Sequence, residues 1–288
     1  MIWTLYRWTW RVKAPLYLGL PPAGSLNRTR LFVPVRTLWG ALTAELARHE
    51  ADAAPPEYEG VGLTLRKDAR LGYLFPAETI GGKWQAWLSR YESGLVWTRE
   101  DGLQSQSDRA FRRRVLNAKP GTSIDPEADT AEDGSLRETE CIQTKWRAKD
   151  GLGEPAVAMT GYVFLRGDSL RARLDVIQQL FVGGDTRYGL GLIERSGGLV
   201  EANCFFGHPV VALDMDSPRV VAAVVRGHAG STDEGSTLRG DRERVLGWND
   251  GKLGGNVDTT LWCPGSSSSC SRAQWSIDED GFWRNISP

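Results

Sequence analysis

The chain has 288 residues, of which 41% are hydrophobic and 12 are tryptophan, so it can bury a sizeable core as one large domain or two modest ones. This composition excludes a disordered chain. Its 35 lysine and arginine residues and 36 aspartate and glutamate residues leave a formal net charge of -1, which excludes a global positive field, so any nucleic-acid site has to be local.

The sequence carries no targeting signal and no paired cysteines. Arg7, Arg11 and Lys13 interrupt the first 20 residues, and no apolar run reaches the roughly 18 residues that a membrane helix needs, so we expect neither export nor a membrane partner. No Cys-x-x-Cys motif occurs, and we interpret all four cysteines as reduced thiols of a cytoplasmic protein. They are Cys141, Cys204, Cys263 and Cys270.

The first elements follow recognisable periodicities. Residues 2–12 mostly alternate between two faces, which predicts an opening β-strand. After a loop marked by prolines and glycines, the apolar spacing over residues 38–49 predicts a helix with Thr37 as its N-cap. Strands are then expected at residues 61–65 and 71–75.

A short helix is expected at residues 84–91, before a polar excursion from the core. Residues 101–134 contain few apolar side chains, and the basic ones precede the acidic ones. Strands are expected to resume at residues 135–146 and 155–165, so the excursion would form the tip of a long hairpin.

The most informative stretch is the glycine-rich segment 182–192, which follows a predicted helix capped by Asp168 and runs into a strand. Its glycines allow positive φ, and successive N–H groups can form a concave anion-binding nest. Arg187 adds a phosphate partner and Tyr188 a stacking face for single-stranded RNA. The simpler alternative is a flexible turn without a ligand. The RNA-binding candidates here are Gly183, Gly184, Thr186, Arg187, Tyr188, Gly189 and Gly191.

This segment matches neither common nucleotide-binding loop. A P-loop requires Lys and Ser or Thr after its glycines, and neither follows here. A dinucleotide fingerprint follows a strand and opens a helix, which is the reverse of the order predicted here. We therefore expect no nucleotide cofactor.

Four stretches in order along the chain resemble the RAMP superfamily, the ferredoxin-like RNA-binding subunits of CRISPR complexes. Residues 183–191 look like the glycine-rich loop that follows the second helix of that fold. Residues 14–19 are similar to the family's first-strand ending, with Tyr17 where some relatives have histidine, and residues 32–42 resemble its helix entry, with Val35 where many have glycine.

The fourth stretch resembles a segment of type III subunits, especially those that cap the 5′ end of the guide RNA (crRNA). It combines residues 123–126 with residues 130–136 and Glu140. The resemblance therefore points to the single subunit at the 5′ handle of the guide, the fifth Cas family. It implies the crRNA and backbone RAMP subunits as partners, and the target RNA indirectly through the guide.

The resemblance also implies a fold and a domain division. The expected class is α+β, with a ferredoxin-like, RRM-type RAMP domain over residues 1–197. A long inserted hairpin, used by the family as a thumb, would occupy about residues 101–150. Residues 198–288 would form either a degenerate second RAMP half or, as we favour, a β-rich extension.

Basic side chains supply the rest of the expected RNA site. The arginines at 109–114 would hold phosphates from a mobile hairpin, although a solvated loop face neutralised by the following acidic run is the alternative. Arg28, Arg30 and Arg36 flank the first helix and are weaker candidates. The predicted site adds Arg36, Arg109, Arg112, Arg113, Arg114 and Lys119 to the glycine-rich segment.

Two other function classes stay open. A RAMP endoribonuclease would cleave precursor crRNA at a 2′-OH with His, Tyr or Lys as general acid and base. We instead expect His49 to act as a cation at a helix end, and His208 and His228 to be ordinary surface residues, so we predict no catalytic residue.

A protein-binding scaffold would expose aromatic surface, yet we expect the early tryptophans in the core: Trp3, Trp8, Trp10 and Trp39. Cys263 and Cys270 have a poor zinc spacing, and no histidine is close to them in the sequence. We therefore predict no metal site.

Overall fold

A computed structural model gives the fold of the chain, and it describes residues 2–52, 54–147, 155–230, 238–245, 248–249, 252–253 and 259–286. The class is α+β, as expected. The helices of the described residues are α1 (Val35–Glu50), α2 (Tyr58–Asp68), α3 (Asp108–Val115), α4 (Asp168–Asp175) and the 3-10 turn η1 (Thr186–Tyr188). None of the helices in this described part is long and apolar enough to cross a membrane.

A ten-stranded sheet forms the centre of the molecule. Its longest pair joins β1 and β12 in antiparallel register, from Trp3 opposite Arg166 to Arg11 opposite Ala158. The strand order is β13-β14-β1-β12-β4-β5-β6-β7, with β15 also paired to β1 and β3 to β12. The strands are β1 (Trp3–Val12), β3 (Ala69–Leu71), β4 (Phe75–Ile80), β5 (Lys83–Tyr91), β6 (Leu95–Arg99), β7 (Ser105–Ser107), β12 (Ala158–Arg166), β13 (Gln179–Phe181), β14 (Leu192–Arg195) and β15 (Val200–Glu201).

The predicted opening strand is confirmed as β1, and so is the prediction that the early tryptophans lie in the core. Trp3, Trp8 and Trp10 are almost completely inaccessible, and Trp39 packs, partly buried, against the same core. Burying a large aromatic ring stabilises a fold by roughly 1.5–3 kcal/mol. These tryptophans therefore stabilise the core and are not available as an exposed protein-binding surface.

Helix α1 packs through Leu38, Leu42 and Leu46, whose spacing places them on one buried face. It begins earlier than predicted, because Pro34 is extended and its carbonyl already accepts the N–H of Leu38. Thr37 therefore lies inside the first turn, and the N-cap prediction is wrong.

At two places the secondary structure differs from the predicted one: an expected strand is a helix, and an expected helix is a strand. Residues 61–65 belong to α2, where Val61 and Leu65 are buried and Leu63 between them is 61% exposed; a strand would place all three on one face. Residues 84–91 form β5 instead of a helix. The run from 86 to 89 is buried on both faces, and periodicity cannot distinguish a helix from a strand in such a run.

The predicted helix from Asp168 to the glycines is too long. Helix α4 ends at Asp175, and its N-cap is Gly167, without a side-chain cap. Residues 179–181 form β13, which pairs with β14, because Leu180 can then bury itself in the sheet. The glycine-rich segment therefore connects two antiparallel strands and does not follow a helix directly.

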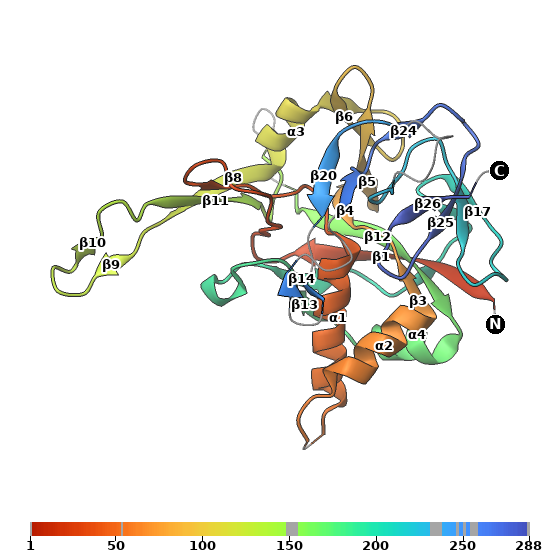
Figure 1. The fold of residues 1–288 in the computed structure, drawn as a ribbon, viewed down its shortest axis with the longest axis horizontal. Helices are drawn as coiled ribbons and strands as arrows, with labels where there is room; N and C mark the ends of the chain where they lie inside the picture. Colours follow the sequence, from red (N-terminus) through yellow and green to blue (C-terminus); the bar gives the residue numbers. More distant parts are fainter. Residues whose placement is uncertain are drawn as a thin grey trace.

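Residues 105–115 of the expected polar excursion form β7 and α3, and from residue 116 the chain forms the expected hairpin, which projects far from the body of the molecule (Figure 1). We call it the projecting hairpin. Its stem pairs β8 with β11 and carries β2 on the outer edge, while β9 and β10 form the tip. The strands are β2 (Leu26–Asn27), β8 (Leu116–Gly121), β9 (Ile124–Asp125), β10 (Thr130–Ala131) and β11 (Arg137–Ile142).

The described residues beyond 198 contain strands joined by turns and loops but no helix, and all of these strands except β15 lie outside the central sheet. Five form one sheet in the order β16-β17-β18-β25-β26, and three pairs complete the region: β19-β24, β20-β23 and β21-β22. Their bounds are β16 (Cys204–Phe205), β17 (His208–Val211), β18 (Arg219–Val221), β19 (Leu238–Arg239), β20 (Arg242–Val245), β21 (Trp248–Asn249), β22 (Lys252–Leu253), β23 (Thr259–Trp262), β24 (Ser267–Ser268), β25 (Gln274–Ile277) and β26 (Trp283–Asn285). The division at residue 197 stays a prediction. The parts of the predicted extension at residues 231–237 and 254–258 lie outside the described residues.

Candidate RNA-binding surface

The glycine loop, residues 182–191, packs closely on the segment that follows β1. The N–H of Val182 donates to the carbonyl of Gly191 at 2.9 Å and closes the loop. Gly183 and Gly191 have φ of 88° and 90°, which favours glycine. A Cβ on Gly183 would overlap the carbonyl oxygen of Tyr17, and one on Gly191 would lie 2.6 Å from that of Val182. Close approach of two backbones therefore explains these two glycines.

Three backbone N–H groups of the glycine loop do not point outward as an anion nest requires. Gly184 donates to the carbonyl of Tyr17, Gly191 to that of Pro15, and Gly189 to that of Thr186, at 2.9, 2.9 and 3.2 Å. Because these three donors already form hydrogen bonds inside the protein, the prediction of an anion-binding nest is wrong at these positions. The loop can still meet RNA through its side chains.

Those side chains form an exposed platform with the stem of the projecting hairpin. Tyr188 is 70% exposed, and the guanidinium of Arg137 on β11 lies 5.7 Å from its ring centre. Lys119 on β8 is opposite Thr139, so Lys119 and Arg137 lie diagonally on one face of the stem. We call Arg137, Lys119, Arg187 and Tyr188 the loop platform. Arg187 is exposed beside Tyr188, so the platform combines cations with a stacking face.

The arginines at 109–114 lie on helix α3 and not in a mobile hairpin. The side chain of Ser107 caps this helix by accepting the N–H of Ala110, and Phe111 stacks on Trp97 with ring centres 4.4 Å apart. A rigid helix next to β6 and β8 therefore presents these cations (Figure 1).

The members of this arginine cluster have different surroundings. Arg114 pairs with the buried carboxylate of Glu78 at 2.9 Å and lies over Trp146, so it anchors α3 to the core. Arg112 pairs with Asp108 at 2.8 Å. Arg109 and Arg113 are exposed, and no ion pair forms at either within the described residues. These two are the arginines free to meet a phosphate.

Three hollows meet at Arg30, and they bring together candidates that are far apart in the sequence. A hollow of about 220 Å³ is lined by Arg30, Gly183 and Gly184. Another of about 100 Å³ is lined by Arg30, Arg36 and Thr37. The third, of about 360 Å³, is lined by Arg30 and Arg112 and is the largest of the three. We call it the central hollow.

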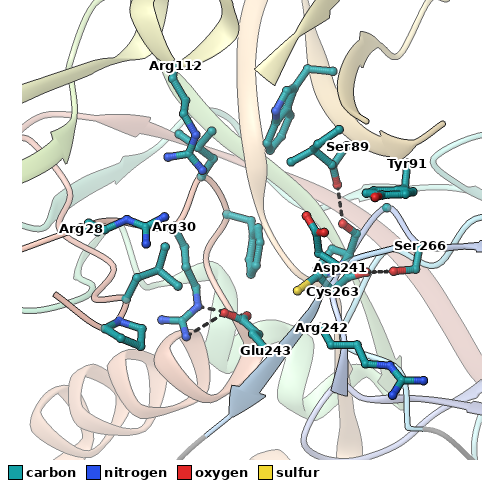
Figure 2. A pocket seen from close by; sticks show the side chains of 18 residues that line it. Arg28, Arg30, Ser89, Tyr91, Arg112, Asp241, Arg242, Glu243, Cys263 and Ser266 are labelled. Atoms are coloured by element: carbon teal, nitrogen blue, oxygen red, sulfur yellow. Dashed lines mark hydrogen bonds and ion pairs between the residues drawn. The ribbon is translucent and has the colours of Figure 1, made fainter. Parts of the chain in front are cut away.

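The central hollow has a basic wall opposite a wall of mixed charge. Figure 2 shows Arg28, Arg30 and Arg112 along one side, and along the other Asp241, Arg242, Glu243 and Cys263. Arg30 donates to both carboxylate oxygens of Glu243 at 3.2 Å. Aromatic side chains complete the lining: Phe32, Tyr91 and Trp97. The hollow therefore offers cations and flat apolar faces for a nucleotide, which sequence reasoning missed because its walls come from distant segments.

The histidines do not assemble a catalytic pair on this surface. His49 is exposed in the last turn of α1, where a cation is favoured. His228 is only 1% exposed and contacts Tyr73 and Glu243. His208 is half-buried, and its pKa is lowered to about 4, mainly by burial and also by the positive charge of Arg226. The prediction that His208 and His228 are ordinary surface residues is wrong.

Comparison with known proteins finds similarity in structure alone. No protein-family model matches the chain, and no curated protein matches it. A chain in the cryo-EM structure of the Type III-B Cmr-beta bound to cognate target RNA aligns with a TM-score of 0.55 and 11% identity, over 91% of this chain and 86% of that one. A chain of the same assembly bound to cognate target RNA and AMPPnP gives a TM-score of 0.52 and 10% identity, over 91% and 85%. The chain thus shares the fold of a type III Cmr-beta subunit.

Proposed function

We propose that this chain is an RNA-binding, non-catalytic subunit of a type III CRISPR effector complex. The observation that carries the proposal is the fold shared over 91% of the chain with a subunit of the Type III-B Cmr-beta bound to cognate target RNA. Fold alone does not assign a function, so the site has to supply the second argument. It does so with the loop platform and the central hollow, which give a nearly neutral chain a local surface of cations and aromatic rings.

Within such a complex, we propose that the chain binds the 5′ handle of the crRNA and caps the filament of backbone RAMP subunits. A ferredoxin-like core is supported by the series β1, α1, β4, β12, α4, β14, which reads strand-helix-strand-strand-helix-strand, with β14, β1, β12 and β4 adjacent in one sheet. The projecting hairpin would serve as the thumb that reaches a neighbouring subunit. The target RNA would meet this chain only through the guide.

The mode of binding follows from the platform. A base of a splayed single strand would stack on the exposed ring of Tyr188, while Arg187, Lys119 and Arg137 would contact phosphates on both sides. Arg109 and Arg113 would extend this path along α3, and Arg28 with Arg112 would receive a nucleotide at the central hollow. Because the contacts are electrostatic, affinity should fall steeply with salt.

The test is binding of the purified protein to a labelled guide RNA with its repeat-derived 5′ handle, compared with the same RNA without it. We expect handle-dependent, salt-sensitive binding without cleavage, weakened by Arg187→Ala and by Arg112→Ala. The matched control is Arg284→Ala, since Arg284 is exposed on β26, far from the projecting hairpin (Figure 1). Cleaved RNA would instead favour the endoribonuclease. Absence of handle preference, even with backbone subunits present, would leave a protein-binding scaffold.

A further inference from the structure

Three side chains with metal-binding atoms converge behind the central hollow. A ring nitrogen of His228, a carboxylate oxygen of Glu243 and the Sγ of Cys263 all lie within 4.8 Å of one another. His228 is distant from Cys263 in the sequence but close to it in the fold, so the absence of a neighbouring histidine in the sequence did not exclude a metal-binding cluster. Sequence spacing could not show this cluster, because its members come from three separate segments.

Backbone hydrogen bonds hold these segments in place. The residue after His228, Ala229, exchanges both of its backbone hydrogen bonds with Trp262, at 3.0 and 2.9 Å. Trp262 immediately precedes Cys263, and it pairs in register with Arg242, next to Glu243. The three donors are therefore preorganised by strand pairing, independent of any contact between their side chains.

The surroundings suit metal ligands. The Oη of Tyr73 lies 2.6 Å from Nδ1 of His228, so an Nδ1–H can donate to it. Nε2 contacts the Glu243 carboxylate, and a metal bound to both would replace the proton that these two atoms share. Tyr73 is buried, so its hydroxyl is held in place beside the ring. Arg30 donates to Glu243 and would orient that carboxylate, which has further lone pairs to offer.

The same three residues do not form a nucleophilic triad. Both ring nitrogens of His228 already have partners, Tyr73 and Glu243, so neither is available to take a proton from Cys263. No base is therefore placed to activate the Cys263 thiol, and the three donor atoms can instead surround one metal ion.

We propose that His228, Glu243 and Cys263 bind a zinc ion, with the fourth position of its tetrahedron directed to the central hollow. Thiolate, imidazole and carboxylate are the zinc donors of proteins. Zinc bonds of about 2.0–2.3 Å require donor separations of roughly 3.3–3.8 Å, so a cluster within 4.8 Å closes around the ion with a shift of about 1 Å. Glu243 and Cys263 both line the hollow, so a water or an anion could complete the site.

Cobalt substitution tests this site on the full-length chain after treatment with a chelator. Co²⁺ has no closed d shell and reports thiolate ligation by a charge-transfer absorption band. We expect the band to saturate at one equivalent, to disappear when Zn²⁺ is added, and to be absent in Cys263→Ser. The matched control, Cys204→Ser, changes an exposed thiol and should keep the band. No band in the wild-type chain, or a band that persists in Cys263→Ser, would overturn the proposal.

A second variant keeps the test decisive if Cys263→Ser unfolds. Tyr73→Phe retains all three ligands and removes only the hydroxyl that orients His228, so we expect the band with an affinity for Co²⁺ about 10-fold weaker. Unchanged affinity in Tyr73→Phe would contradict the proposed orientation of His228. Since this site does not depend on RNA, its failure would leave the proposed function untouched.

Discussion

The glycine loop and the central hollow meet at Arg30 but are built in opposite ways. The loop turns its backbone inward, where Gly184 and Gly191 donate to the carbonyls of Tyr17 and Pro15, and its side chains outward. The hollow turns side chains inward, with arginines facing carboxylates across a cavity of about 360 Å³. The loop can therefore contribute exposed contacts to RNA, whereas the hollow contributes depth and charge.

The largest expected effect is on the backbone packing of the loop. Gly183→Ala should destabilise the protein by roughly 3 kcal/mol, because a Cβ would overlap the Tyr17 carbonyl at a φ of 88°. The matched control is Gly189→Ala, which has φ 78° but no atom within 4 Å of the new Cβ and should lose only about 1 kcal/mol. Urea unfolding measures both. Equal losses would mean that close packing does not explain Gly183.

The next prediction distinguishes, on helix α3 beside the hollow, an arginine that stabilises the fold from one that binds RNA. Arg114→Ala should lower the free energy of unfolding by about 2 kcal/mol, because Glu78 is buried and would lose one of the two arginines that it pairs with among the described residues, keeping Arg99. Arg113→Ala, on the exposed side of the same helix, should leave stability unchanged and weaken RNA binding. Chemical denaturation and fluorescence anisotropy report the two effects. A stable Arg114→Ala protein with weakened RNA binding would reverse these roles.

A smaller effect tests the stacking face of the loop platform. Tyr188→Ala should weaken binding to the guide RNA by roughly 1–2 kcal/mol, about 5- to 30-fold in Kd, because one base loses its stacking partner. Tyr188→Phe keeps the ring and should bind like the wild type. If Tyr188→Phe were as weak as Tyr188→Ala, the hydroxyl and not the ring would carry the contact.

The contrast between loop and hollow also explains what the sequence could predict. Strongly periodic elements, such as β1 and α1, and the polar hairpin were predicted, because local patterning determines them. Residues 61–65 and 84–91 were assigned the wrong type, because short apolar runs lack a decisive period.

Only the loop part of the candidate site could be predicted from local sequence patterns. The exposed Arg187 and Tyr188 follow from their place in a glycine-rich turn, and a local motif suffices to find them. The hollow depends on residues near 30, 112 and 243, which tertiary pairing alone brings together. No spacing rule along the chain could have placed Glu243 opposite Arg30.

The smallest expected effect decides whether RNA enters the hollow at all. For single strands, the slope of log Kobs against log salt concentration changes by about 0.7 for each phosphate contact that is lost. Lys119→Ala removes a platform cation and should reduce the slope by about that amount. Arg28 is exposed at the rim of the hollow and makes no ion pair among the described residues, so Arg28→Ala removes a cation without breaking an internal contact. A similar reduction for Arg28→Ala would mean that the strand continues from the platform into the hollow. An unchanged slope for Arg28→Ala would mean that the RNA contacts the loop platform and does not enter the central hollow.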